Sequence, residues 1–306
     1  MKSLFELACD GLPKLVRFSM DGSRLLAINS QAEVIVWDLE QRIMVNKLSA
    51  DGGILDADFC LDNNYVVLAS RWEYGDLSIV RVTDQKKTAK LEVTGVHSVT
   101  VQPKTGMIIT GRPEDRKLDF ILPGFLSVYD PSLNLLTEIS VDVHPSQMAF
   151  SNDGQMLAVE HGAVTIWRIT GHHQLEMIWN GLDIFRSGQC ESTCIAITPN
   201  GRYVAAGFRG CPEGKILVID VEKQQPIGWF AKEFEAGIRA VAFSQTGQYL
   251  VGSNVGGQAV HIWHRETGNL VHKYNIPDCY ALALSPSGDH LAIGSRDSIS
   301  IWRFTE

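Results

Sequence analysis

The pattern of apolar and polar positions repeats along the whole chain. An alternating apolar segment leads into a short polar turn, a second apolar segment follows, and this unit recurs seven times. Alternation with a period of two predicts β-strands, and turns rich in Gly, Asn, Asp and Pro are typical of tight hairpins. The turns are Ser19-Met20-Asp21-Gly22, Cys60-Leu61-Asp62-Asn63, Pro103-Lys104-Thr105-Gly106, Ser151-Asn152-Asp153-Gly154, Pro199-Asn200-Gly201, Ser244-Gln245-Thr246-Gly247 and Ser285-Pro286-Ser287-Gly288.

The spacing of these turns indicates a β-propeller. Successive turn positions 22, 63, 106, 154, 201, 247 and 288 lie 41 to 48 residues apart. Repeats of this length are typical of propeller blades, each too small to bury its own faces alone. We therefore expect an all-β fold, a seven-bladed β-propeller with four antiparallel strands per blade, in which residues 1–306 form one domain.

A second repeated position carries a resemblance to a known family. The third strand of each unit ends in an apolar residue that is followed by a polar, mostly charged one, and these pairs are Trp37-Asp38, Val80-Arg81, Tyr129-Asp130, Trp167-Arg168, Ile219-Asp220, Trp263-His264 and Trp302-Arg303. Over nearly the whole chain this pattern resembles the WD40 repeats. The resemblance implies a closed ring that binds other macromolecules and performs no chemistry of its own.

The repeats also depart from the family's pattern. One repeat alone has the Trp-Asp pair, and no Gly-His dipeptide precedes the first strands. We therefore expect the blades to be held chiefly by packing of apolar strands, rather than by the family's Asp-His-Ser-Trp hydrogen-bond network. In the last repeat the chain stops after its third strand, and the segment 3–8 is expected to supply the missing fourth strand of blade seven, which would close the ring and remove its open edges.

Two connections are longer than a regular blade requires. The interval from Gly106 to Tyr129 is 23 residues, against 13 to 18 in the other blades, and the interval from Trp167 to Gly201 is 34 residues, against 25 to 28 elsewhere. Surplus loop residues are where binding function concentrates. Loops between second and third strands and loops between blades emerge on the same face, so both surpluses are expected to flank a notch over blade four.

The predicted partner-binding residues come from this face, where aromatic and Arg side chains favour a protein interface. They lie in the blade-three loop, the blade-four turn, the blade-four-to-five loop and the neighbouring loops of blades two and five: Arg112, Arg116, Phe120, Leu122, Glu160, His161, Asp183, Phe185, Arg186, Trp72, Tyr74 and Arg209. The alternative is that the apolar side chains among them cover strand ends and the arginines are merely solvated.

Composition limits the other possibilities. A hydrophobic fraction of 45%, a charged fraction of 20% and a formal net charge of -8 describe a globular protein that repels phosphate, which argues against nucleic acid or a membrane as partner. Acidic residues near the N-terminus do not fit a signal peptide, so a cytoplasmic location is expected. The six cysteines show no disulfide framework, and we expect reduced, mostly buried thiols.

Motifs for chemistry are absent from the sequence. It contains no nucleophile elbow, P-loop or dinucleotide fingerprint. Cys190, Cys194 and Cys211 with His172 or His173 have poor spacing for zinc, so neither a metal nor another cofactor is expected. Arg17 and Asp58 are expected to form a structural ion pair near the channel.

The sequence thus favours a noncatalytic scaffold or adaptor, a subunit of a larger complex that binds a protein or peptide partner. The alternative is an enzyme or small-ligand receptor with its site at the central channel. Convergent carboxylates or histidines in the channel would favour that alternative, and a lining of Ala, Val and Thr would count against it.

Overall fold

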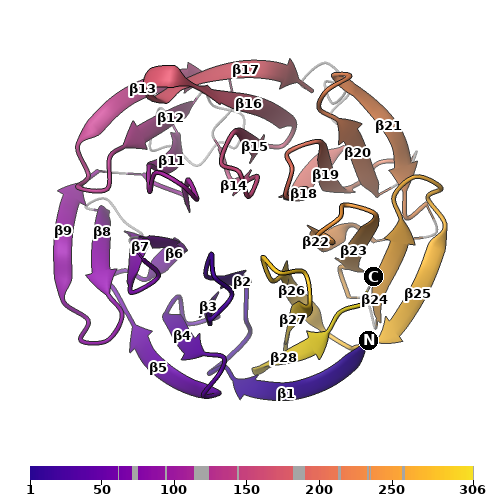
Figure 1. Ribbon diagram of the computed structural model, residues 1–306, viewed down its shortest axis with the longest axis horizontal. Helices are drawn as coiled ribbons and strands as arrows, with labels where there is room; N and C mark the ends of the chain where they lie inside the picture. Colours follow the sequence, from indigo (N-terminus) through magenta and orange to yellow (C-terminus); the bar gives the residue numbers. More distant parts are fainter. Residues whose placement is uncertain are drawn as a thin grey trace.

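The computed structural model describes residues 1–60, 62–70, 75–93, 95–113, 124–142, 145–181, 190–212, 215–232, 234, 236–256 and 259–305, with the backbone alone at residue 172. The described strands form seven four-stranded antiparallel sheets, which Figure 1 shows arranged around a central channel. The predicted seven-bladed β-propeller is confirmed. We call the strands of each blade a to d, from the channel outward.

Each of the first six blades is a meander of four strands that are consecutive in the chain. Blades one to three contain β2 (Leu15–Phe18), β3 (Arg24–Ile28), β4 (Val34–Asp38), β5 (Ile43–Leu48), β6 (Ile54–Cys60), β7 (Tyr65–Ser70), β8 (Asp76–Arg81), β9 (Lys87–Glu92), β10 (Ser98–Val101), β11 (Ile108–Pro113), β12 (Gly124–Tyr129) and β13 (Leu135–Val141). Blades four to six contain β14 (Gln147–Phe150), β15 (Met156–Glu160), β16 (Val164–Thr170), β17 (Gln174–Asn180), β18 (Glu191–Ile197), β19 (Tyr203–Arg209), β20 (Ile216–Asp220), β21 (Gln225–Phe230), β22 (Ile238–Phe243), β23 (Tyr249–Asn254), β24 (Ala259–His264) and β25 (Leu270–Asn275).

Blade seven joins the two ends of the chain. It consists of β26 (Cys279–Leu284), β27 (His290–Ser295), β28 (Ser298–Arg303) and, as its outer strand, β1 (Lys2–Ala8). The β1–β28 register runs from Lys2 opposite Arg303 to Ala8 opposite Ser298. Closure by the N-terminal segment is confirmed, and it leaves no open edge where the chain ends meet.

The turns between strands a and b follow the predicted hairpin chemistry. In blade one the hydroxyl of Ser19 accepts a hydrogen bond from the Arg24 amide at 2.9 Å and donates one to Asp21 at 2.7 Å. Gly22 has a φ of +73°, a left-handed conformation that disfavours residues with a Cβ. The same arrangement of hydroxyl and amide recurs in four other blades, at Ser151, Thr198, Ser244 and Ser285.

The core lies between neighbouring blades. One cluster packs Val218 of blade five against Phe243 and Trp263 of blade six, and another packs Trp37 of blade one against Ile301 of blade seven. Burial of each such side chain contributes about 1.5–3 kcal/mol. The predicted face-to-face packing of apolar strands is therefore confirmed as the main interaction between blades.

Blade four adds a hydrogen-bond chain that the degenerate repeat pattern did not predict. Trp167 Nε1 donates to the hydroxyl of Thr165 at 2.9 Å, and His161 Nε2 lies 3.3 Å from the same hydroxyl. This chain contains a His, a hydroxyl and a Trp, so a part of the network expected to be missing is present here. The repeats differ from the family's sequence pattern, so the sequence alone did not predict these hydrogen bonds.

The cysteine prediction is wrong for one pair. Cys190 and Cys211 form a disulfide, whereas the sequence analysis expected every thiol to be reduced. Cys190 precedes β18 and Cys211 follows β19, and the pairing of these strands places the two Cα atoms 4.7 Å apart. Cys9, Cys60, Cys194 and Cys279 are buried free thiols, as predicted.

Helical structure in the described chain consists of the turn η1 (Gly171–His173). No helix within these residues has the length and apolar character that crossing a bilayer requires.

Candidate functional site

Four of the predicted partner-binding residues are described, namely Arg112, Glu160, His161 and Arg209. The other eight lie outside the described residues: Trp72, Tyr74, Arg116, Phe120, Leu122, Asp183, Phe185 and Arg186. The strand ends that bound the two long connections are described, and both connections join ends on one face of the ring, because b–c and d–a ends share a face in a meander. We call this face the loop-bearing face.

Arg112 is engaged within blade three. Its guanidinium lies 3.0 Å from the carboxylate of Glu138 and 4.3 Å from the centroid of the Phe125 ring. Burial by itself would raise the pKa of Glu138, but hydrogen bonds from Ser127 and Arg112 outweigh it and lower that pKa. Arg112 belongs to strand β11 rather than to the loop, so its described contacts are structural.

Glu160 and His161, predicted as partner-binding residues over blade four, are buried. Their exposed fractions are 4% and 5%. The Glu160 carboxylate accepts hydrogen bonds from the Ser192 hydroxyl at 2.5 Å and from the Gly162 amide at 2.8 Å. Burial raises the pKa of Glu160 to about 7, although both hydrogen bonds act to lower it. Glu160 therefore connects blades four and five in the interior, whereas His161 lies near Thr165 of its own blade.

Arg209 is the predicted residue that the structure leaves most exposed among the four described. It ends β19, and its side chain is 63% exposed while its guanidinium contacts Glu191 across the β18–β19 pair at 2.5 Å. Because an exposed ion pair contributes little to stability, this contact leaves Arg209 available at the surface.

One sector of the central channel carries a buried ion network. Arg17 of blade one lies 3.3 Å from Asp56 and 3.6 Å from Asp58, both in blade two. Its guanidinium also donates to the Ala57 and Val99 carbonyls at 2.7 and 3.0 Å. Burial by itself would lower the pKa of Arg17, but the charges of Asp56 and Asp58 outweigh it and raise that pKa.

The two carboxylates extend this network to blade three. Asp56 accepts the Val99 amide at 2.8 Å, and Asp58 accepts the Val101 amide at 3.0 Å. The Val99 and Val101 amides on the channel-facing edge of β10 therefore have side-chain acceptors from the preceding blade. The predicted Arg17–Asp58 pair is confirmed, while Asp56 was not anticipated.

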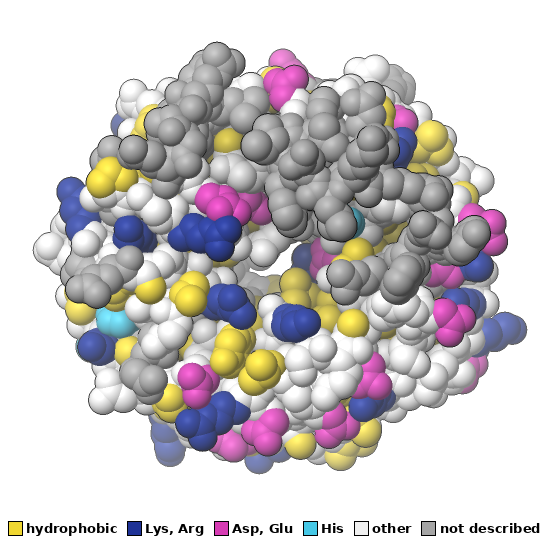
Figure 2. Space-filling model, turned by 180° about the vertical axis from the view of Figure 1, so that it is seen from behind, with side chains coloured by type: hydrophobic (Ala, Val, Ile, Leu, Met, Phe, Trp, Pro, Cys, Tyr) yellow, Lys and Arg dark blue, Asp and Glu magenta, His cyan; other side chains and the backbone are white. Residues whose placement is uncertain are grey.

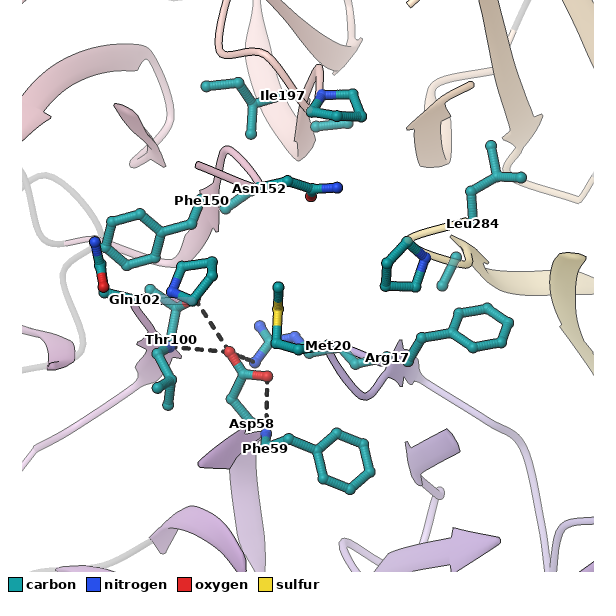
Figure 3. A pocket seen from close by; sticks show the side chains of 18 of the residues that line it. Arg17, Met20, Asp58, Phe59, Thr100, Gln102, Phe150, Asn152, Ile197 and Leu284 are labelled. Atoms are coloured by element: carbon teal, nitrogen blue, oxygen red, sulfur yellow. Dashed lines mark hydrogen bonds and ion pairs between the residues drawn. The ribbon is translucent and has the colours of Figure 1, made fainter. Parts of the chain in front are cut away.

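The rest of the channel has a mixed lining, in which apolar side chains lie beside polar ones such as Asn63, Gln102, Asn152 and Gln245. At the end formed by the a–b turns it opens into a cavity of about 580 Å³. Figure 3 shows Phe59, Phe150, Ile197 and Leu284 around this cavity, with Asp58 and Arg17 beside them. The lining also contains Ala149, Ala196, Ala242, Ala283, Val101, Val241 and Thr100. Among the described residues, no group of three or more potential metal ligands occurs.

The opposite mouth lies on the loop-bearing face. Its cavity has a volume of about 410 Å³. Seven residues at one repeat position mark the entry of the a strands, and we call them the entry ring: Lys14, Leu55, His97, Ser146, Thr193, Arg239 and Tyr280. Each lies five residues before the one at which its a strand enters the a–b turn, namely Ser19, Cys60, Gln102, Ser151, Thr198, Ser244 and Ser285. All except Thr193 line this mouth.

β-Bulges set the direction of several entry-ring side chains. In blades two, five, six and seven the a–b register shifts at this position, so Leu55, Thr193, Arg239 and Tyr280 each stand as the extra residue of a β-bulge. Bulges re-orient single side chains and are frequent beside functional sites. Loop lengths in the sequence do not indicate this ring, whereas a fixed distance before the end of each a strand does.

Similarity to known proteins covers part of the chain. A segment of 131 residues, 40% of this chain, is 25% identical to THO complex subunit 3 of Arabidopsis thaliana. A segment of 145 residues, 45% of this chain, is 26% identical to Periodic tryptophan protein 2 of Saccharomyces cerevisiae. The matched segments span 40% and 14% of these relatives. No family model matches the chain.

Proposed function

This chain is a seven-bladed β-propeller of the WD40-repeat type, and from that premise we propose that it is a noncatalytic scaffold that binds a protein or peptide on its loop-bearing face. We further propose that it works in the cytoplasm as a subunit of a larger complex. The likeness to a protein whose name makes it a complex subunit supports this role. Fold alone does not identify a partner, so the surface must carry the argument.

The observation that carries the proposal is that both surplus connections and the β-bulge residues belong to one face of the ring. Both surplus connections leave from strand ends on this face, and the bulges direct Arg239, Tyr280 and Leu55 to the channel mouth between them. The opposite face is formed by short a–b turns, whose side chains bond to their own backbone. A rigid ring that presents irregular segments at one end is suited to docking.

The test replaces residues 114–123 by Asn-Gly. Pro113 pairs with Gly124, so a two-residue turn can join these strand ends without disturbing blade three. The deletion is narrower than the loop inferred from sequence, because Arg112 and Pro113 are part of β11. The expected result is reduced recovery of co-purifying proteins, measured by quantitative mass spectrometry, with an unchanged melting temperature.

A matched control shortens a loop on the other face. Replacing Gly171–His173 by Asn-Gly removes η1 between β16 and β17, whose ends pair at Thr170 and Gln174. This variant should recover the same proteins as the wild type. Equal recovery by both variants and the wild type would contradict the contribution of the blade-three loop.

A further inference from the structure

Four entry-ring residues from consecutive blades form an arc at the loop-bearing mouth. In ring order they are Arg239 of blade six, Tyr280 of blade seven, Lys14 of blade one and Leu55 of blade two. The Arg239 guanidinium lies over the Tyr280 ring, 5.2 Å from its centroid. Lys14, Arg239 and Leu55 are exposed. The arc therefore presents two cations, an aromatic ring and an aliphatic side chain toward solvent.

The two cations of the arc differ from Arg17, Lys47 and Arg296 of blades one and seven, which form ion pairs. Arg17 is paired with Asp56 and Asp58, Lys47 with Asp10 and Glu33, and Arg296 with Asp278. Within the described chain, no carboxylate lies within ion-pair distance of Lys14 or Arg239. Figure 2 shows Lys and Arg side chains beside the opening of the channel.

This charge arrangement is unusual for the chain as a whole. The formal net charge is -8, and two cations without an ion-pair partner among the described residues lie together at this mouth, an arrangement that favours a local positive field on an otherwise acidic protein. Such a field attracts an anionic group on a partner and repels cationic ones. The nearest carboxylate in the lining, Asp56, is 6% exposed and already bonded to Arg17 and to the Val99 amide.

We propose that the arc binds an extended acidic peptide, with Asp or Glu carboxylates on Arg239 and Lys14 and apolar side chains beside Tyr280 and Leu55. This inference rests on the proposed function and specifies its partner. The cations belong to blades six and one, with blade seven between them, which suits two separate carboxylates along a peptide. A polyanion such as RNA would be repelled by the net negative charge of the whole chain, whereas a short acidic segment contacts only the mouth.

The experiment selects binding peptides from a displayed library of random twelve-residue sequences, using the wild-type protein. Asp and Glu should be enriched around an apolar position. The affinity of the strongest selected peptide, labelled with fluorescein, is then measured by fluorescence polarisation. The K14E/R239E variant should bind it at least about tenfold more weakly, since both charge-assisted contacts become repulsive. A peptide with its acidic residues changed to Lys should regain affinity for this variant.

The control variant K2E/K273E makes the same change in net charge on exposed outer strands, at Lys2 of β1 and Lys273 of β25. It should bind the selected peptide within about twofold of the wild type, as expected for charges remote from the site. A selection without enrichment of Asp and Glu would overturn the inference, as would an equal loss of peptide affinity in both variants. The inference would also fail if a twelve-nucleotide oligouridine competed as strongly as the unlabelled peptide and K14E/R239E abolished that competition. If peptides bind but only the 114–123 replacement weakens them, the docking face stands and the acidic site does not.

Discussion

The Ser192 hydroxyl of blade five donates a 2.5 Å hydrogen bond to the buried carboxylate of Glu160 in blade four. The Ser192 amide also donates to the Gly162 carbonyl, at 3.3 Å, so the end of β15 and the start of β18 are tied at two points. A carboxyl group in this position connects blades four and five directly. Its protonation state therefore affects the stability of that connection.

Glu160 predicts a pH dependence of stability. Burial raises its folded pKa from 4.5 to about 7, so the folded protein holds a proton that the unfolded chain releases. The associated stability is present below about pH 4.5 and is lost as the pH rises toward 7, at a total of roughly 3 kcal/mol. E160Q keeps a neutral acceptor and should remove this decline.

Urea unfolding of the wild type and E160Q between pH 5 and pH 8 measures the difference. The exposed Glu92, changed to Gln, is the control and should leave the wild-type profile unchanged. Parallel profiles for the wild type and E160Q would show that Glu160 does not titrate in this range.

Arg17 predicts a second effect on stability. R17M leaves the buried Asp56 and the half-buried Asp58 without their countercharge, and loss of one partner of a buried ion pair costs about 3–5 kcal/mol. The variant R17M/D56N/D58N removes both uncompensated charges and keeps side-chain oxygens that accept the Val99 and Val101 amides. It should be more stable than R17M when both are unfolded by urea. A loss below about 1 kcal/mol in R17M would mean that solvent neutralises the carboxylates.

The disulfide predicts four free thiols, rather than six, in the denatured and unreduced protein. Alkylation followed by mass spectrometry counts them. The Cys190–Cys211 bond closes a loop of 21 residues, and the double variant C190S/C211S should lose about 3 kcal/mol of stability. Six alkylated thiols in protein freshly purified without oxidant would show that Cys190 and Cys211 are reduced, as predicted from the sequence.

Ring closure predicts strong dependence on β1. Leu7 is 3% exposed and packs among residues of blades one and seven, so L7D places an unpaired carboxylate in that core. The expected result is a melting transition lowered by at least about 10 °C or a loss of soluble protein. L4D is the milder control because Leu4 is only half-buried in the same strand. Equal melting of L7D and the wild type would show that the ring is stable without this strand.

The repeated turns and the period of 41 to 48 residues determined the architecture before any coordinates. They act locally, since hairpin formation needs only the turn residues and the alternation of the adjoining strands. The closing strand was also predictable, because the last repeat lacks a strand and the first residues form one. The Arg17–Asp58 pair followed from their equivalent places in neighbouring repeats.

Only the tertiary structure decided which side chains of the loop-bearing face are available. Glu160 and His161 look like exposed turn residues in the sequence, yet the packing of blade five against blade four buries both. The Cys190–Cys211 bond and the exposure of Lys14 and Arg239 likewise depend on strand pairing and bulges. Burial and side-chain direction are set by contacts between segments far apart in the chain, and a pattern read along one strand does not contain them.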